Sequence, residues 1–224
     1  MKEGDTPSIL GLLPNGLNVP ERPDWGGWGG RYELRTPEPT PLSQNLAAPG
    51  QGDVPVAETR PIWTDAEDAY APIRPRLHGR ANTPDTAVHR GNKLTLLRWR
   101  DDFQNDFAAR MDWTVASYAD ANHPPVPRLA HADSLTVRSG EYFRLDASGT
   151  TDPDGDSMSY DWFEYPEAGS YAGRLGFVSN LYSASLRAPE VEVPQTIHFI
   201  LRVTDKGTPA LARYRRVVVT VVPR

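Results

Sequence analysis

Beyond residue 128, apolar and polar side chains alternate with a period of two. The alternation is clearest where Ile197, Phe199 and Leu201 are separated by His198 and Ile200. Successive side chains of a β-strand point to opposite faces of a sheet, so this pattern predicts strands with one buried face. The predicted strands cover residues 134–138, 141–147, 158–165, 183–193, 196–204 and 211–222.

The number and spacing of these strands predict the fold of this region. Turn sequences such as Asp154-Gly155 and Lys206-Gly207 separate them. Six or seven short strands in about 95 residues are typical of an immunoglobulin-like sandwich of two packed sheets. We expect Trp162, on the strand after the first of these turns, to fill the centre of its core.

Between residues 92 and 121 the apolar positions recur every three or four residues instead. Polar residues such as Asp102 and Asn105 occupy the positions between them. This pattern predicts an amphipathic helix with room for one break, and Pro124 ends it because proline forces its predecessor out of the helical region. The apolar positions are Leu96, Trp99, Phe103, Phe107, Met111, Val115 and Tyr118.

The first 90 residues are rich in proline and glycine. They hold 13 of the 22 prolines and the tract Trp25-Gly-Gly-Trp-Gly-Gly30, which predicts a region that is mostly loop. Within it, the apolar run from Ser8 to Leu13 is compatible with a buried strand or a helical turn. The patterns together predict an α+β chain, with a loop-rich part and one helix in residues 1–122 and an all-β sandwich in residues 123–224.

Charge and composition exclude several classes of function. The net charge is -5, with 13 basic and 17 acidic residues before Asn122 and 11 basic and 12 acidic residues after it. Neither half has the basic excess that neutralises phosphates, so nucleic acid is not an expected partner. The absence of cysteine excludes disulfides, thiolate zinc sites and a cysteine nucleophile. No stretch approaches the roughly 20 apolar residues that span a bilayer, and the first residues do not resemble a signal peptide.

Aromatic rings in the glycine tract are candidate carbohydrate contacts. Trp25, Trp28 and Tyr32 stand among glycines, with Arg31 beside them. Aromatic faces stack on the apolar faces of sugars, and arginine supplies donors in a fixed geometry. The alternative is that these rings fold back into the core.

An Asp-rich turn is the candidate metal site. Asp152, Asp154 and Asp156 alternate with Pro153 and Gly155 between two predicted strands. Carboxylate oxygens at this spacing suit Ca²⁺, which binds six to eight oxygens. The alternative is a β-turn whose carboxylates bond the local backbone.

Two acidic residues near the start are the remaining candidates for chemistry. Glu3 and Asp5 form either a carboxylate pair for acid–base work or metal ligation, or an exposed N-terminal segment or helix cap. The five histidines are scattered without metal-ligand spacing, and the sequence has no nucleophile-elbow or zincin motif.

Six segments of the sequence match a known family. They are Glu3–Ser8, Pro14–Leu17, Trp25–Tyr32, Phe103–Trp113, Ala121–Pro125 and Leu145–Asp156. Together they resemble a bacterial cellulose-binding family, and the resemblance covers almost the whole chain. Members of that family join a nucleoside hydrolase-like α/β domain to a C-terminal immunoglobulin-like domain, and the second half of this chain is also similar to PKD and cadherin-like modules.

The resemblance implies that this chain is the C-terminal part of such a protein. It implies a secreted or periplasmic location and a missing N-terminal nucleoside hydrolase-like half as a partner. Nucleoside hydrolases bind Ca²⁺ and ribose through an aspartate cluster of DxDxxxDD type that this sequence does not contain, so a complete hydrolytic site is not expected. Glu3 and Asp5 match a family segment that would lie near the pocket, which makes them the residual ligand candidates.

Three functions therefore compete. The leading one is a non-catalytic carbohydrate-binding module with a polysaccharide, such as cellulose, as its partner. The second is a fragment of a hydrolase that acts on N-glycosidic or glycosidic bonds, whose catalytic half lies elsewhere. The third is a structural spacer or adhesion sandwich.

Overall fold

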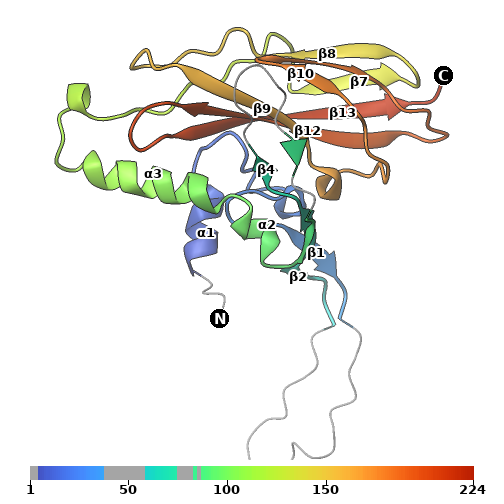
Figure 1. Ribbon diagram of the computed structural model, residues 1–224. Coiled ribbons are helices and arrows are strands. Elements are labelled where there is room, and N and C mark those ends of the chain that lie inside the picture. The colour runs from blue at the N-terminus through green and yellow to red at the C-terminus, as the bar shows by residue number, and fades with distance from the viewer. Residues whose placement is uncertain (1–4, 38–58, 75–82, 85–86) are drawn as a thin grey trace, which may run out of the picture.

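A computed structural model describes residues 5–37, 59–74, 83–84 and 87–224 (Figure 1). Most of its regular structure is β, with few helices. The first part holds α1 (Asp5–Leu12), β1 (Tyr32–Arg35), β2 (Ile62–Asp65), β3 (Asp68–Tyr70), β4 (Ile73–Arg74), β5 (Thr83–Pro84), β6 (His89–Gly91), α2 (Leu94–Leu97) and α3 (Arg100–Asp112). Three short 3₁₀ helices span Pro23–Trp25, Tyr118–Asp120 and Pro166–Ala168. The second part holds β7 (Ser134–Arg138), β8 (Tyr142–Asp146), β9 (Met158–Glu164), β10 (Val178–Asn180), β11 (Ser183–Arg187), β12 (Gln195–Asp205) and β13 (Ala212–Val222).

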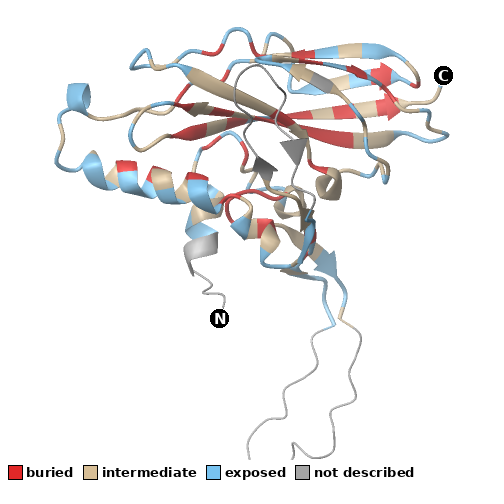
Figure 2. Cartoon of the chain, viewed as in Figure 1, coloured by how far each residue is buried: buried red, intermediate tan, exposed pale blue. Residues whose placement is uncertain are grey.

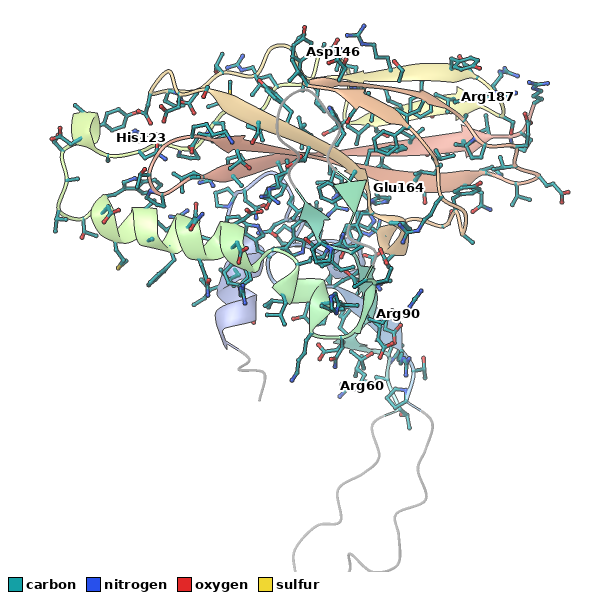
Figure 3. The ribbon with its side chains drawn as sticks, in the orientation of Figure 1. Arg60, Arg90, His123, Asp146, Glu164 and Arg187 are labelled. Carbon is teal, nitrogen blue, oxygen red and sulfur yellow. The ribbon has the colours of Figure 1, made fainter. Side chains whose placement is uncertain are left out.

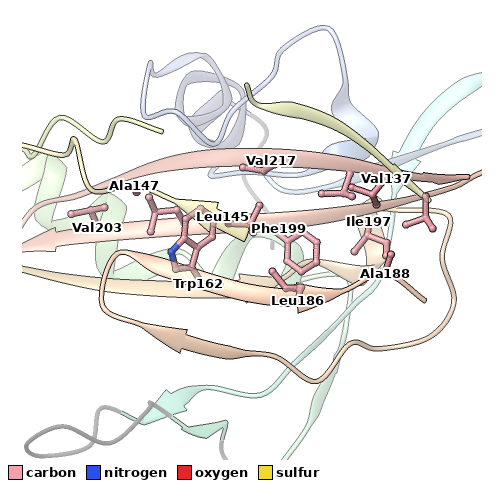
Figure 4. Packing of buried hydrophobic residues seen from close by; sticks show 14 residues of the cluster. Val137, Leu145, Ala147, Trp162, Leu186, Ala188, Ile197, Phe199, Val203 and Val217 are labelled. Carbon is pink, nitrogen blue, oxygen red and sulfur yellow. The ribbon is translucent and has the colours of Figure 1, made fainter. Parts of the chain in front are cut away.

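Two sheets face each other in the second part of the chain. One has the strand order β7-β13-β12-β9, with β7 parallel to β13, and the other has the order β10-β11-β8. Between them lies a core whose members come from both sheets, including Leu145 and Leu186 from one and Phe199 and Val217 from the other (Figure 4). Trp162 belongs to this core and is 6% exposed, as predicted.

The predicted strands are confirmed with two changes. The segment predicted over residues 183–193 ends as a strand at Arg187, because Pro189 has no backbone N–H for a ladder. The short strand β10 was not predicted. The first 90 residues are also less irregular than predicted, since α1 is a helix and β1 to β6 form three two-stranded ribbons.

The outer face of the four-stranded sheet is covered, not exposed. Alternation predicted one solvent-facing side for β12, yet His198 is 1% and Ile200 0% exposed. Segments from the first part of the chain pack on this face and make a second core cluster (Figure 2). Its buried members are Leu17, Trp28, Trp99, Tyr165, Ile200, Ala212 and Tyr214.

The predicted helix begins in the right place, but α3 ends at Asp112, well before Pro124, and only part of the predicted apolar stripe faces the sheet. The predicted helix breaks once, between α2 and α3. Toward the sheet, α3 turns Asp102 and Asp106, which are 6% and 1% exposed, whereas Phe107 is 63% exposed. Trp99 and Phe103 of the predicted stripe do pack in or against the second core cluster, so the stripe faces inward there and outward at Phe107. Arginines of the sheet hold the two aspartates inward, because Arg202 lies 3.4 Å from Asp102 and Arg213 lies 2.8 Å from Asp106.

Candidate functional site

The candidate site is built around one asparagine between α1 and the glycine tract. The side-chain amide of Asn18 donates to the carbonyls of Leu10 at 2.7 Å and Leu13 at 2.8 Å, which satisfies acceptors at the end of α1. Its Oδ1 accepts the backbone N–H of Trp28 at 2.9 Å. The amide therefore fixes the end of the helix against the tract.

Close approach explains the glycines of the tract. A Cβ on Gly27 would lie 2.3 Å from Oδ1 of Asn18, so a side chain there would break the bond just described. Gly26 adopts a φ of 73° and lies against the hydroxyl of Tyr165, where no other residue fits without strain. The tract is therefore a constrained wall and not a flexible loop.

Two hollows open beside this wall. The first has a volume of about 370 Å³ and the second about 500 Å³. Because they share Arg22, Tyr32 and Trp63 as lining residues, we call them together the groove. The first is also lined by α1 and the glycines, and the second by carboxylates, among them Glu21, Asp24, Glu33 and Glu167.

Two aromatic residues stand in both hollows. Tyr32 begins β1, and its hydroxyl donates to the carbonyl of Gly29 at 3.0 Å. Trp63 lies opposite Leu34 in the antiparallel pair of β1 and β2 and is 48% exposed. The sequence prediction missed Trp63, whose only signal is the β-forming run Ile62-Trp63-Thr64. Its partner strand lies about 30 residues earlier, and a single sequence does not reveal that pairing.

Charge in the groove is arranged in pairs. Arg22 donates to both carboxylate oxygens of Asp24, at 2.9 and 2.5 Å, and this bond lowers the pKa of Asp24 below its usual range. Arg35 lies 2.5 Å from Glu33. Nε and Nη2 of Arg22 are thus taken by Asp24, and the groove offers carboxylate oxygens beside aromatic rings, groups that can bind hydroxyls and an apolar ring face together.

The predicted carbohydrate contacts separate into two groups. Tyr32 and Arg31 line the second hollow, although Arg31 is held by Asp68 at 2.8 Å and by the carbonyl of Glu67 at 2.6 Å. Trp28 is 1% exposed and packs edge-on against Tyr214 and Phe103. Because its ring does not reach solvent, the structure corrects the assignment of Trp28 from ligand contact to core.

The ring of Trp25 contacts two arginines and a histidine. The guanidinium carbon of Arg22 lies 4.4 Å from the ring centroid and that of Arg216 lies 5.6 Å from it, while His198 meets the ring edge-on at 4.8 Å. Neither hollow has Trp25 among its lining residues. The ring therefore packs between the glycine tract and the four-stranded sheet.

The Asp-rich turn is closed by its own backbone. Oδ1 of Asp152 accepts the N–H groups of Asp154 and Asp156, both at 3.0 Å. Asp154 accepts the N–H of His123 at 2.6 Å and contacts Nδ1 of the same histidine at 2.9 Å, near the end of the molecule where Figure 3 labels His123. Within the described part of the chain, no group of three or more acidic or histidine side chains is placed to hold a metal ion.

For the acidic pair near the start, the structure describes only the backbone of Asp5. Glu3 lies outside the described residues. Asp5 begins α1, where an acidic residue suits the helix N-terminus, and its side chain is not described.

Comparisons with known proteins match both parts of the chain. A family model described as the C-terminal domain of cellulose-binding protein Sde0182 matches residues 142–221. Another, described as the nucleoside hydrolase-like domain of cellulose-binding Sde182, matches residues 1–32. These matches confirm the predicted resemblance at the level of the family models. None of the curated proteins matches the chain.

One solved structure is similar over nearly the whole chain. It is a nucleoside hydrolase-related hypothetical protein from Saccharophagus degradans associated with carbohydrate metabolism, 32% identical with a TM-score of 0.72. The match covers 98% of this chain and 48% of that one, so the chain spans about half the length of this relative. A 2,6-sialyltransferase of Photobacterium sp. JT-ISH-224 is 16% identical over 40% of this chain and 17% of its own, with a TM-score of 0.29, and carries no argument.

Among the helices that the structure describes, none is long and apolar enough to cross a bilayer.

Proposed function

We propose that this chain binds carbohydrate in the groove, with Trp63 and Tyr32 as its stacking rings. The observation that carries the proposal is that one half-exposed tryptophan and one tyrosine line both hollows beside carboxylates. Sugars present apolar ring faces and peripheral hydroxyls, which match this combination. Both matching family models are named for cellulose-binding proteins, which supports the same ligand class.

A retention assay on insoluble cellulose tests this function. Stacking rings contribute on the order of 1 kcal/mol each, so Trp63→Ala is expected to weaken retention about five- to tenfold. Tyr32→Phe keeps the ring and is expected to retain most of the binding. Tyr142→Ala is the matched control, because Tyr142 is 77% exposed on the other sheet. Equal retention of wild type and Trp63→Ala, or an equal loss in Tyr142→Ala, overturns the assignment to the groove.

A hydrolase is the second candidate. The observation that favours it is the match of residues 1–32, which include Glu3 and Asp5, to a nucleoside hydrolase-like domain. In this alternative, Asp5 at the start of α1 would contribute one carboxylate to a site completed by further residues. Release of free base or sugar from nucleosides by the chain, lost in Asp5→Asn, would support it.

The proposed ligand class also suggests a location and a fold type. Cellulose is a polymer outside the cell, which supports a secreted or periplasmic location. The order of the two sheets and the parallel pairing of β7 with β13 support an immunoglobulin-type sandwich of the PKD or cadherin-like kind. A spacer role remains the outcome if no glycan is retained.

A further inference from the structure

The first hollow of the groove offers a ligand apolar surface and no unpaired charge. Its lining side chains are mostly apolar, among them Leu12, Val19 and Pro20. In the part of the chain that the structure describes, Arg22 is its only charged lining residue, and Nε and Nη2 of that arginine are taken by Asp24. The carboxylates of the groove line the second hollow instead.

The polar side chains of the first hollow are already engaged. The amide of Asn18 donates to the carbonyls of Leu10 and Leu13 and accepts the N–H of Trp28. Ser8, which also lines the hollow, makes an interaction of its own. A ligand that took over the amide of Asn18 would break the contacts between α1 and the glycine tract. Hydrogen bonds to a ligand are therefore expected from the backbone.

Two backbone donors of the glycine tract have no partner. Gly27 and Gly29 are buried and line the first hollow. Among the residues that the structure describes, neither N–H group makes a hydrogen bond, whereas the N–H groups of Trp28 and Gly30 are both bonded. Buried N–H groups without a partner are rare because they have lost their bonds to water. A water molecule beside apolar walls would also find few of the two to four partners that it needs.

Glycines leave room for a small group beside these donors. A Cβ on Gly27 would lie 2.3 Å from Oδ1 of Asn18, and a Cβ on Gly11 of α1 would lie 3.6 Å from Cα of Gly29. Helix and tract therefore approach each other with no side chain between them at these positions. A ligand group with an acceptor atom and an apolar part fits both the unpartnered donors and the apolar walls.

We propose that the first hollow binds the acetamido group of an N-acetylated sugar, an inference that rests on carbohydrate binding in the groove. The acetamido carbonyl oxygen has two lone pairs and accepts the N–H groups of Gly27 and Gly29. Its methyl group packs against the apolar side chains of Leu12 and Val19. The sugar ring that carries the group stacks on Tyr32 or Trp63, which line both hollows, and its hydroxyls donate to the carboxylates of the second hollow.

The charges of the groove favour this neutral group over an ionised one. Four acidic residues and two arginines line the second hollow, so a carboxylate or sulfate on the sugar would lie beside an excess of negative charge. An ammonium group would find carboxylates there, but it has no acceptor for the N–H groups of Gly27 and Gly29. The hydroxyl of glucose at the same ring carbon has an acceptor oxygen, yet it has no methyl group for the apolar walls.

Three trisaccharides with the same β-linked backbone test the proposal. They differ only in the substituent on the second ring carbon, which is a hydroxyl in cellotriose, an ammonium in the glucosamine trisaccharide and an acetamido group in the N-acetylglucosamine trisaccharide. Isothermal titration of the whole chain measures each Kd. We expect the N-acetylated trisaccharide to bind about tenfold or more tighter than cellotriose, because it satisfies two buried donors and buries its methyl group. In amide NMR spectra, the Gly27 and Gly29 resonances should move with this ligand and much less with cellotriose.

A variant that fills the hollow adds a second test. Gly11→Leu places a side chain beside Gly29 and is expected to lower the affinity for the N-acetylated trisaccharide to that for cellotriose. Ile9→Leu is the matched control, because it puts the same side chain on α1 at a position that is 63% exposed and lines neither hollow. It should keep the affinity of the wild type.

The outcomes separate this inference from the proposed function. Equal affinities for the three trisaccharides, or tightest binding of the glucosamine trisaccharide, overturn the acetamido assignment and leave carbohydrate binding in place. A preference for the N-acetylated ligand with unmoved Gly27 and Gly29 resonances also overturns it, because the group is then recognised elsewhere. If none of the three binds, the inference and the proposed function both fail. If Gly11→Leu does not fold, the affinities and resonances of the wild type decide the point.

Discussion

The indole nitrogen of Trp28 donates a hydrogen bond to the hydroxyl of Tyr214 at 3.3 Å, although 186 positions separate the two residues. The same tyrosine hydroxyl donates to Asp102 on α3. One side chain of the last strand therefore connects the glycine tract and the helix to the sheet.

Trp28→Ala should destabilise the protein severely. The ring is 1% exposed, and large-to-small changes at such tryptophans cost about 3–5 kcal/mol of unfolding free energy because a cavity remains. Urea denaturation followed by circular dichroism measures the change. Trp63→Ala is the matched control and should cost about 1 kcal/mol or less, since its ring is half exposed. Comparable losses in the two variants would contradict the assignment of Trp28 to the core.

Replacing Asp106 on α3 should lower the unfolding free energy more than replacing the apolar Phe107 beside it. Asp106→Ala leaves Arg213 without its carboxylate at 2.8 Å in a buried site, which is expected to cost about 3 kcal/mol or more. Phe107→Ala removes a ring that is 63% exposed and should change the unfolding free energy by about 0.5 kcal/mol or less. Thermal melts of the two variants side by side decide the point, and a larger loss for Phe107→Ala would refute the observed orientation of α3.

His198 should make stability depend on pH in the acid range. Burial, and next the neighbouring cation of Arg216, lower the pKa of His198 to about 3. Arg22 opposes and Asp24 favours its protonation more weakly. The unfolded histidine titrates near 6.5, so between about pH 6.5 and 3 the unfolded chain binds the additional proton and stability falls as the pH falls.

Between pH 7 and pH 5 this histidine should account for a loss of about 2 kcal/mol in unfolding free energy. Urea titrations of wild type and His198→Gln at both pH values isolate its contribution from that of the carboxyl groups. An equal pH dependence in the two proteins would contradict the predicted shift.

Calcium should leave the Asp-rich turn unaffected. Oδ1 of Asp152 already accepts two backbone N–H groups and Asp154 is held by His123, and the described part of the chain has no group of three or more acidic or histidine side chains placed to hold a metal ion. Melting in millimolar Ca²⁺ and in chelator should coincide, whereas Asp152→Ala should cost about 1 kcal/mol through the lost turn bonds. A rise of the melting temperature with Ca²⁺ but not with Mg²⁺ would support the calcium site predicted from the sequence.

The isolated fragment of residues 123–224 should fold, but with reduced stability. All members of the first core cluster lie in this fragment, which supports a cooperative transition. Its sheet would, however, expose Ile200 and Tyr214 and hydrate the buried Arg216. We expect a melting temperature lower than that of the whole chain by on the order of 10 °C. A transition at the same temperature as the whole chain would show that the second cluster contributes nothing.

The local pattern predicted the strands of the second part well, because each strand carries its own period of two. Residues 134–138 were predicted to the exact residue, and β12 and β13 to within one residue at each end. The inner face of β12 was also predictable, since Phe199 and Leu201 can face only one sheet. The burial of His198 and Ile200 was not, because the segments that cover them lie more than 100 positions earlier.

The site was predicted less well for a related reason. Composition marked the glycine tract as unusual, and Tyr32 does line the groove. It did not separate Trp25 and Trp28, which bind the sheet, from Trp63, which faces the hollows. Likewise, the apolar stripe of α3 predicted one inward face. Phe103 does pack against the second core cluster, but Phe107 is exposed because Arg202 and Arg213 of a distant hairpin hold Asp102 and Asp106 inward. Charge partners far away in sequence therefore changed the orientation that periodicity alone predicted.

Arg216 limits which parts of the molecule recombination can exchange separately. Its guanidinium is 6% exposed and donates to the carbonyls of Leu17 at 3.2 Å and Gly26 at 2.7 Å, and burial lowers its pKa to about 10. A recombinant gene that transplanted only the sandwich would carry this cation without the acceptors that solvate it in the fold. A recombination junction in the proline-rich segment near residue 124 would separate Arg216 from the carbonyls of Leu17 and Gly26, so chimaeras made there would lose these hydrogen bonds. Strand β13 and the glycine tract must therefore be exchanged together, which makes the evolutionary module larger than the sandwich.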